Sequence, residues 1–157
     1  MARRRAREFA LQALFQIDMT GCSPRDALAS LWMGLVEGEG MAGIKPADAD
    51  EVEFAEALVQ GVIGRGAELD AHIESASQNW RLVRMPVVDR NILRLSAYEL
   101  LTATDVPGNV CINEAIELAK RFGDKDSKAF VNGILDRIAA EVGRGGRKHP
   151  PRPAPAG

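Results

Sequence analysis

The sequence predicts an all-α protein, a compact bundle of about seven helices, and three observations support this fold class. Apolar residues recur at spacings of three and four along most of the chain, as they do on one face of a helix. Glycine, proline and capping residues interrupt this pattern where helices would begin and end. The 157 residues, 46% of them hydrophobic, suffice for one globular domain with a substantial core.

The first two helices are predicted within the first 36 residues. The first has a core-facing stripe that consists of Phe9, Ala10, Ala13, Leu14 and Ile17. Gly21 follows this stripe as a stop signal. Ser23 is a favourable N-cap residue, and Pro24 after it suits the first position of a helix. The second helix should therefore begin at Pro24 and run to about Val36.

A loop, a third helix and a helix break are expected next. Residues 37–47 are rich in glycine and lack periodicity, which predicts a loop. Asp48 and Glu51 then form a start similar to a capping box, so a helix should follow. Three glycines within 61–66 indicate a break, after which the helical pattern continues to Ala76.

The second half of the domain shows the clearest helical signals. Pro86 opens a helix that should extend to about Ala103, and its broad apolar surface places it at the centre of the bundle. A turn at 106–109 precedes a helix that Gly123 ends. The last helix carries an apolar stripe that consists of Val131, Ile134, Leu135, Ile138 and Val142.

Charge is segregated along the chain. Residues 1–7 contain four arginines, residues 143–157 contain four basic residues, and neither segment contains an acid. Residues 8–142 hold all 22 acidic residues and the other 12 of the 20 basic ones, a formal charge of −10. Basic ends on an acidic body suggest local contact with a polyanion, although merely solvated ends fit the charge equally well. The glycine- and proline-rich segment 143–157 should be disordered, which leaves 1–142 as the folded domain.

Several function classes find no support in the sequence. No apolar stretch approaches the roughly 20 residues of a membrane span, and no signal peptide follows the basic start, so we expect a cytoplasmic protein without membrane contact. Cys22 and Cys111 lie far apart without a CxxC pattern, which indicates neither a disulfide framework nor a zinc site. His72 is the one histidine within the predicted helices, too little for a catalytic constellation. We therefore expect no enzymatic activity, no metal and no cofactor.

Two phenylalanines fall outside the core stripes of their helices. Phe15 lies on the far side of the first helix near Arg4, and an aromatic beside arginines suits base stacking with phosphate neutralisation. Phe130 lies about 100° from the centre of the last stripe, close to Lys125 and Lys128. The alternatives are that another helix covers Phe15 and that Phe130 is an ordinary aromatic at the flank of the core.

Four segments carry a resemblance to a known family. They are 3–8 (RRRARE), 88–100 (VDRNILRLSAYEL), 112–120 (INEAIELAK) and 122–136, which begins with FG and contains FVNGILD. Together, and in this order, they resemble the NusB family of bacterial transcription antitermination factors over roughly residues 3–142. Residues 33–50 and the segment 143–157 depart from the family pattern, and 71–85 matches it only loosely.

The resemblance implies a function and a site. NusB proteins are all-helical, bind the boxA element of leader RNAs as single strands, and pair with the ribosomal protein NusE. The complex helps RNA polymerase to read through terminators, notably in ribosomal RNA operons. By matching motif positions, the implied RNA site consists of Arg3, Arg4, Arg5, Arg7, Phe15, Asp126 and Phe130. Phe15 stands where the family often has tyrosine. Asp89 is implied in NusE docking, although it also suits the first turn of a helix after Pro86.

Two other classes of function compete with this interpretation. A related helical domain forms the N-terminal part of some ribosomal RNA cytosine methyltransferases, but the sequence leaves no room for their catalytic domain. A helical protein-interaction adaptor without direct RNA binding is the stronger alternative, because an acidic body and exposed aromatics could serve protein partners alone. Salt-dependent RNA binding would distinguish the adaptor from the RNA-binding protein.

Overall fold

The computed structural model describes residues 2–38, 45–78 and 80–144, which form seven α-helices and one short 3₁₀ turn and contain no strand. In chain order these are α1 (Ala2–Thr20), α2 (Pro24–Glu37), α3 (Ala49–Gly64), α4 (Gly66–Ala76), η1 (Leu82–Arg84), α5 (Val87–Thr102), α6 (Gly108–Phe122) and α7 (Ser127–Glu141). The predicted all-α class and the number of helices are confirmed. Part of the predicted 37–47 loop lies outside the described residues.

The helix ends follow the predicted local signals. After α1, Gly21 has a φ of +71°, a left-handed conformation that glycine adopts without a steric penalty. The Ser23 hydroxyl caps α2 by accepting a 3.0 Å hydrogen bond from the backbone N–H of Asp26. Asp48 and Glu51 form a capping box in which each side chain accepts from the other's backbone N–H, at 2.8 and 3.0 Å. Short-range chemistry thus determines where these helices begin.

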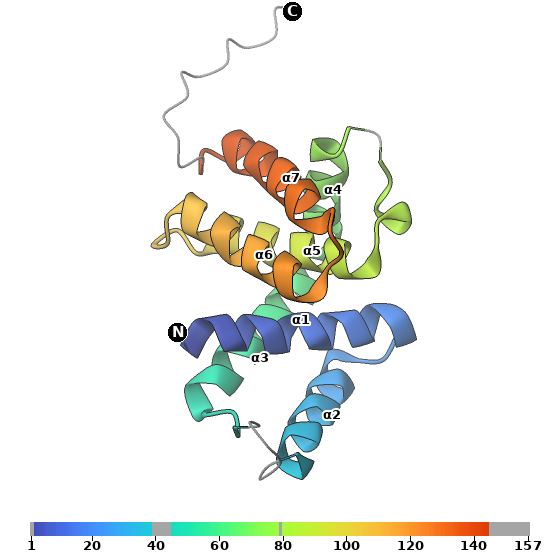
Figure 1. Cartoon of the computed structure of the whole chain (residues 1–157), viewed down its shortest axis with the longest axis vertical. Coiled ribbons are helices and arrows are strands. Elements are labelled where there is room, and N and C mark those ends of the chain that lie inside the picture. The colour runs from blue at the N-terminus through green and yellow to red at the C-terminus, as the bar shows by residue number, and fades with distance from the viewer. Residues whose placement is uncertain (1, 39–44, 79, 145–157) are drawn as a thin grey trace, which may run out of the picture.

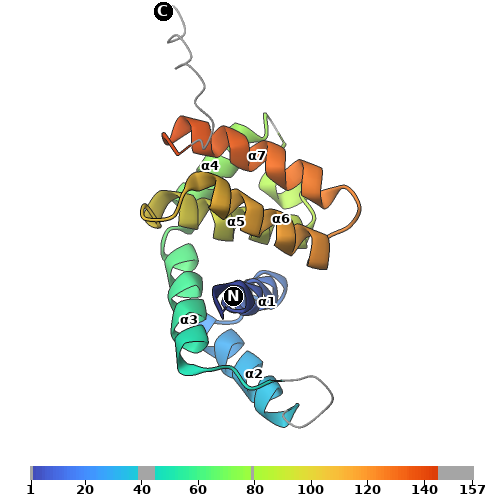
Figure 2. The same ribbon diagram turned by 60° about the vertical axis from the view of Figure 1, so that its left-hand side comes forward.

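Helix α5 lies at the centre of the bundle, as its broad apolar surface predicts. It packs against α1, α3, α4, α6 and α7. Its fully buried apolar side chains are Ile92, Leu93, Leu95, Ala97 and Leu100. In Figure 1, α1 crosses the molecule horizontally, with α6 and α7 above it and α2 and α3 below. Figure 2 shows α3 running alongside the bundle, where it packs on α1, and it joins α4 at the predicted break at Arg65.

Arg144 caps the C-terminal end of α5, although the sequence suggests that it belongs to a disordered tail. Its guanidinium donates to the carbonyl oxygens of Leu100 at 3.1 Å and Ala103 at 2.8 Å, and also to that of Val106. Its own carbonyl oxygen approaches Gly108 so closely that a Cβ there would lie 1.8 Å away. The folded part of the chain therefore reaches Arg144, and the rest of the tail, 145–157, lies outside the described residues.

The described residues also bear on membrane spans, disulfides and metal sites. None of the helices there combines the length and apolar character of a membrane span. Cys22 and Cys111 are both free thiols, and burial raises the pKa of Cys111 above its ordinary value. Nowhere in these ranges do three or more histidine, cysteine or acidic side chains gather in a way that could hold a metal ion.

Candidate nucleic-acid interface

Ion pairs join α1 to α6 on the face that is turned to the viewer in Figure 1. Arg4 binds both carboxylate oxygens of Glu114 at 3.1 Å, and its side chain stays 49% exposed. Arg121, on the last turn of α6, lies 3.4 Å from Glu8 and is 64% exposed. Its guanidinium also lies over the ring of Phe122, 5.4 Å from the centroid. The face therefore has two accessible guanidinium groups, of which only Arg4 is predicted from the sequence.

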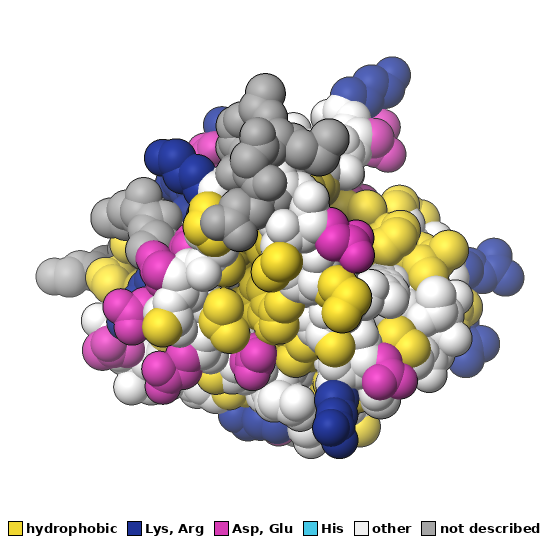
Figure 3. Space-filling view, turned by 90° about the horizontal axis from the view of Figure 1, so that it is seen from below, with side chains coloured by type: hydrophobic (Ala, Val, Ile, Leu, Met, Phe, Trp, Pro, Cys, Tyr) yellow, Lys and Arg dark blue, Asp and Glu magenta, His cyan; other side chains and the backbone are white. Residues whose placement is uncertain are grey.

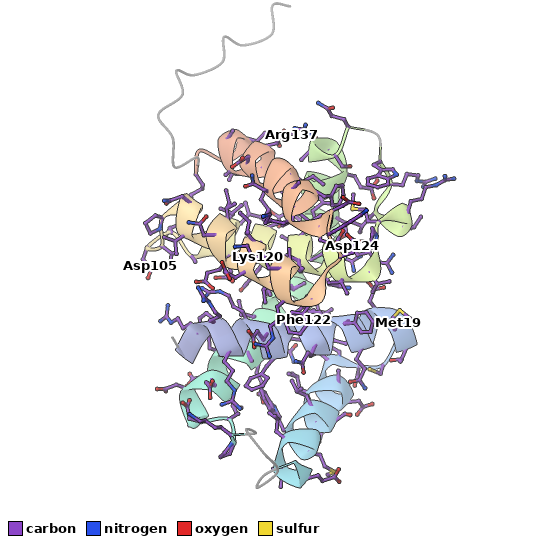
Figure 4. The ribbon with its side chains drawn as sticks, viewed as in Figure 1. Met19, Asp105, Lys120, Phe122, Asp124 and Arg137 are labelled. Atoms are coloured by element: carbon purple, nitrogen blue, oxygen red, sulfur yellow. The ribbon has the colours of Figure 1, made fainter. Side chains whose placement is uncertain are left out.

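Phe15 is exposed on this same side of α1. Its exposed fraction is 39%, so the alternative that a neighbouring helix covers it is wrong. Met19 lies one turn further along the helix and is 58% exposed. In Figure 4, Phe122 lies where α1 passes the end of α6, and Met19 lies further along, at the C-terminal end of α1. By its spacing along the helix, Phe15 thus lies on the same face of α1 as Arg4, about 16 Å further along the helix axis.

A network of polar side chains holds this half of α1 against α5. Asp18 accepts two hydrogen bonds from Arg90, both at 2.7 Å, one from Asn91 at 2.9 Å and one from Arg94 at 3.0 Å. The hydrogen bonds from Arg90 lower the pKa of Asp18 below its ordinary value. Because these partners all lie on α5, they fix the orientation in which α1 presents Phe15.

The turn between α6 and α7 positions the predicted Asp126. Asp124 accepts hydrogen bonds from the backbone N–H groups of Asp126 at 2.8 Å and Ser127 at 3.2 Å, and so orders the start of α7. Asp126 itself is exposed, directly before the first residue of that helix. Figure 4 places Asp124 at this turn, beyond the end of α6. The carboxylate of Asp126 is therefore accessible as a hydrogen-bond acceptor.

Phe130 is half-buried on α7, and its outer neighbour is Trp80. The two rings are 5.2 Å apart at an interplanar angle of 89°, an edge-to-face contact. Trp80 remains 45% exposed. Trp80 begins the segment 80–84 (WRLVR), in which an aromatic residue is accompanied by two arginines. The family match over 71–85 is loose and gives this segment no role.

The arginines at the start of the chain do not form one exposed cluster. Arg3 is exposed, and its guanidinium lies 5.0 Å from the ring centroid of Phe54. Arg5 is half-buried over the ring of Phe9 at 4.9 Å, and it contacts Glu51 at 3.3 Å. Arg3 and Arg5 therefore lie against α3 or the core, whereas Arg4 lies on the face with α6.

Arg7 is a correction to the predicted RNA site. It is only 7% exposed, and its Nε and Nη2 atoms donate to the two carboxylate oxygens of Glu99 at 2.7 and 2.9 Å. Burial lowers the pKa of Arg7, but the hydrogen bonds that Arg7 donates to Glu99, together with the negative charges of Glu99 and Glu114, outweigh burial and raise this pKa above its ordinary value. The prediction that Arg7 contacts a phosphate is wrong, because this side chain points toward α5 and is already paired.

Asp89 is a second correction, because it does not lie on a docking surface. It is 4% exposed in the first turn of α5, where the Ser127 hydroxyl donates a 2.6 Å hydrogen bond to its Oδ1 atom. The start of α7 covers it, so the predicted NusE contact is wrong for this residue. Burial raises the pKa of Asp89, while the hydrogen bond from Ser127 opposes that shift.

We expect Asp89→Asn to gain stability relative to the wild type as the pH rises. A carboxyl group whose pKa is raised by folding contributes its full stability below its unfolded pKa of about 4, and that contribution is lost as the pH rises through the folded value. Asparagine does not titrate, yet its Oδ1 can still accept from Ser127. Urea unfolding of both proteins between pH 4 and 8 measures the difference. A difference that stays constant, or falls as the pH rises, would contradict this assignment.

The opposite side of α1, which faces α2 and α3, is apolar and acidic. Figure 3 views the molecule from below, toward α2 and α3, and shows apolar side chains at the centre with acidic ones around them. On α2, Met33 and Val36 are 63% and 66% exposed. Asp50 and Glu53 on α3 are also exposed. Acidic side chains repel phosphates, so this side is a poor candidate for nucleic acid.

Comparison with known proteins identifies the family. The model of the NusB family matches residues 4–140. The transcription antitermination protein NusB of Myxococcus xanthus is 47% identical over 143 residues, which cover 91% of this chain and 98% of that protein. The structure resembles NusB of T. maritima, with a TM-score of 0.77, 38% identity, and coverage of 88% of this chain and 91% of the other.

A second similar structure is that of the antitermination factors NusB and NusE in complex with double-stranded RNA. It has a TM-score of 0.73 and 27% identity, and the match covers 87% of this chain and 95% of that one. The model of the family and the relatives span nearly all of the described helices, and transcription antitermination proteins are not enzymes. The resemblance seen in the sequence is therefore confirmed, and this chain belongs to the NusB family.

Proposed function

We propose that this protein is a transcription antitermination factor that binds unpaired boxA-type leader RNA on the face formed by α1, the end of α6 and the start of α7. The observation that carries the proposal is the exposed ring of Phe15 on a face that also carries the accessible Arg4 and Arg121. A base can stack on the aromatic ring while the guanidinium groups neutralise neighbouring phosphates. Phe130 and Asp126 extend this surface onto α7.

The ion pairs of the two arginines do not prevent this role. The side chains of Arg4 and Arg121 are 49% and 64% exposed, so each guanidinium keeps N–H groups that face solvent while it pairs with Glu114 or Glu8. A phosphate can therefore bind these N–H groups without breaking either ion pair. Arg7 differs, because its pair with Glu99 is buried. We accordingly propose Arg4 and Arg121 as phosphate contacts on this face, and leave out Arg3 and Arg5, which lie against α3 or the core, and the buried Arg7.

The proposed partner protein is NusE, within an RNA polymerase antitermination complex in the cytoplasm. A similar structure contains NusB and NusE together with RNA, which supports the pairing. The formal charge of −10 on residues 8–142 suits a basic ribosomal protein, and such complementarity speeds association. No single docking residue is proposed, since Asp89 is buried.

We expect Arg4→Gln to weaken the salt dependence of RNA binding. Each lost phosphate contact should reduce the log–log slope of affinity against salt by about 0.7 for a single strand. Arg25→Gln is the matched control, because Arg25 is an exposed arginine on α2, which packs on α1 and α3 and not on α6 or α7. Fluorescence anisotropy with a labelled unpaired boxA-type RNA, with and without NusE, measures both variants.

The outcomes separate the proposed function from the adaptor alternative. A wild-type protein that binds NusE but no RNA, at any salt concentration, would favour a protein-interaction adaptor. Equal slopes for Arg4→Gln and Arg25→Gln would exclude Arg4 as a phosphate contact.

A further inference from the structure

We infer that Trp80 is an additional stacking platform for the RNA and carries the strand beyond Phe130, over the segment between α4 and α5. This inference rests on the proposed function. It extends the binding surface to the segment with the loosest family match, and it adds Arg81 and Arg84 as phosphate contacts.

The indole of Trp80 is accessible and held in place. The edge-to-face contact with Phe130, at 5.2 Å, supports it from the side of α7, and 45% of the residue remains exposed. The Ser77 hydroxyl lies 2.7 Å from the Trp80 carbonyl oxygen and fixes the backbone. A ring that is already ordered loses little conformational entropy when a base stacks on it.

The segment around Trp80 is anchored on both sides. Leu82 and Met85 are 5% and 3% exposed, so η1 is tied to the core immediately after Trp80. Arg137 of α7 donates a 2.8 Å hydrogen bond to the carbonyl oxygen of Ala76 at the end of α4. An exposed tryptophan in an anchored segment differs from one in a freely moving loop, because it can serve as a preformed binding surface.

Charge favours RNA as the occupant. Residues 75–88 contain two basic residues, Arg81 and Arg84, and no acidic one, and both arginines are exposed. Basic groups around an exposed aromatic are what a single strand needs for stacking and phosphate neutralisation.

The segment between α4 and α5 lies next to the proposed RNA surface. In Figure 1 the chain between α4 and α5 lies at the right-hand edge, beside the start of α7. The α6–α7 turn with Asp124 lies on that same side in Figure 4, as does the end of α1 with Met19. A strand that stacks on Phe15 and passes Phe130 therefore reaches Trp80 next.

The chain provides its own fluorescent reporter for this test. It has two tryptophans, and Trp32 lies on α2, where its indole N–H donates to Glu56 at 3.0 Å and its ring contacts Phe9 at 5.4 Å. The variant Trp32→Phe therefore reports on Trp80 alone, and Trp80→Phe reports on Trp32 alone. Both are titrated with the same unpaired boxA-type RNA, after thermal unfolding has shown that both are folded.

We expect the RNA to quench the fluorescence of Trp32→Phe and to leave that of Trp80→Phe nearly unchanged. Trp80→Ala should weaken RNA binding about 5- to 150-fold, whereas Trp80→Phe, which keeps a stacking ring, should lose much less. Binding that depends on Phe15 but shows no quenching and no loss in Trp80→Ala would overturn the inference and leave the proposed function standing. Quenching by NusE without RNA would assign Trp80 to a protein contact and overturn it as well. A wild-type protein that binds no RNA would contradict both.

Discussion

Replacing Glu99 with alanine should destabilise the fold by about 3–5 kcal/mol, because it removes both hydrogen bonds of the buried Arg7 guanidinium to a carboxylate and leaves only Glu114, 3.9 Å away. Arg7 and Glu99 are 7% and 5% exposed and share two hydrogen bonds of 2.7 and 2.9 Å. An arginine cannot escape the cost by losing its proton, as a buried lysine can. Urea unfolding at neutral pH measures the change in the free energy of unfolding.

Two controls distinguish the cost of an unpaired buried charge from the cost of lost packing contacts. The double replacement Arg7→Met with Glu99→Leu removes both charges and keeps most of the volume, so it should be far less harmful than Glu99→Ala, and neutral or stabilising. Glu68→Ala breaks the exposed pair with Arg65 and should lower the free energy of unfolding far less than Glu99→Ala does. If Glu99→Ala cost as little as Glu68→Ala, Arg7 would be free to act elsewhere, and its exclusion from the RNA surface would be wrong.

Replacing Phe15 and Phe130 together with alanine should weaken RNA binding by about 2–6 kcal/mol, since each stacking ring contributes about 1–3 kcal/mol and distant sites add. The two residues differ in their other roles. Phe15 is 39% exposed, whereas Phe130 is half-buried and packs on Trp80. We therefore expect Phe130→Ala to lose both stability and RNA affinity. Anisotropy titrations and urea unfolding of the two single variants and the double variant measure the two effects separately.

The fold could be predicted in some detail because its signals are local. Gly21, Ser23 and the capping box at Asp48 act within a few residues, so the sequence specifies these helix ends directly. The central place of α5 follows from its apolar surface, which is too broad to be covered by one neighbour. The angle of Phe15 to the core stripe permits its exposure, and the structure shows that the ring is 39% exposed although Leu11, one turn earlier on the same side, is buried.

Which charged residues are buried and paired inside the fold could not be predicted in the same way. Arg7 and Asp89 both lie in motifs, but their partners Glu99 and Ser127 are 92 and 38 positions away in the sequence. Only the packing of α1 and α7 on α5 shows that these charges are paired internally. Trp80 escapes prediction for another reason, because it precedes a 3₁₀ turn too short to give a periodic pattern.

Comparing Phe15→Ala with Phe9→Ala shows whether α1 presents an RNA-stacking ring. Both are phenylalanines on α1, one 39% and the other 5% exposed. Loss of the buried Phe9 should cost about 3–5 kcal/mol of stability, while the folded fraction still binds RNA. Phe15→Ala should cost much less stability and weaken RNA binding by about 1–3 kcal/mol. A folded Phe15→Ala protein that binds boxA-type RNA as tightly as the wild type would contradict the account.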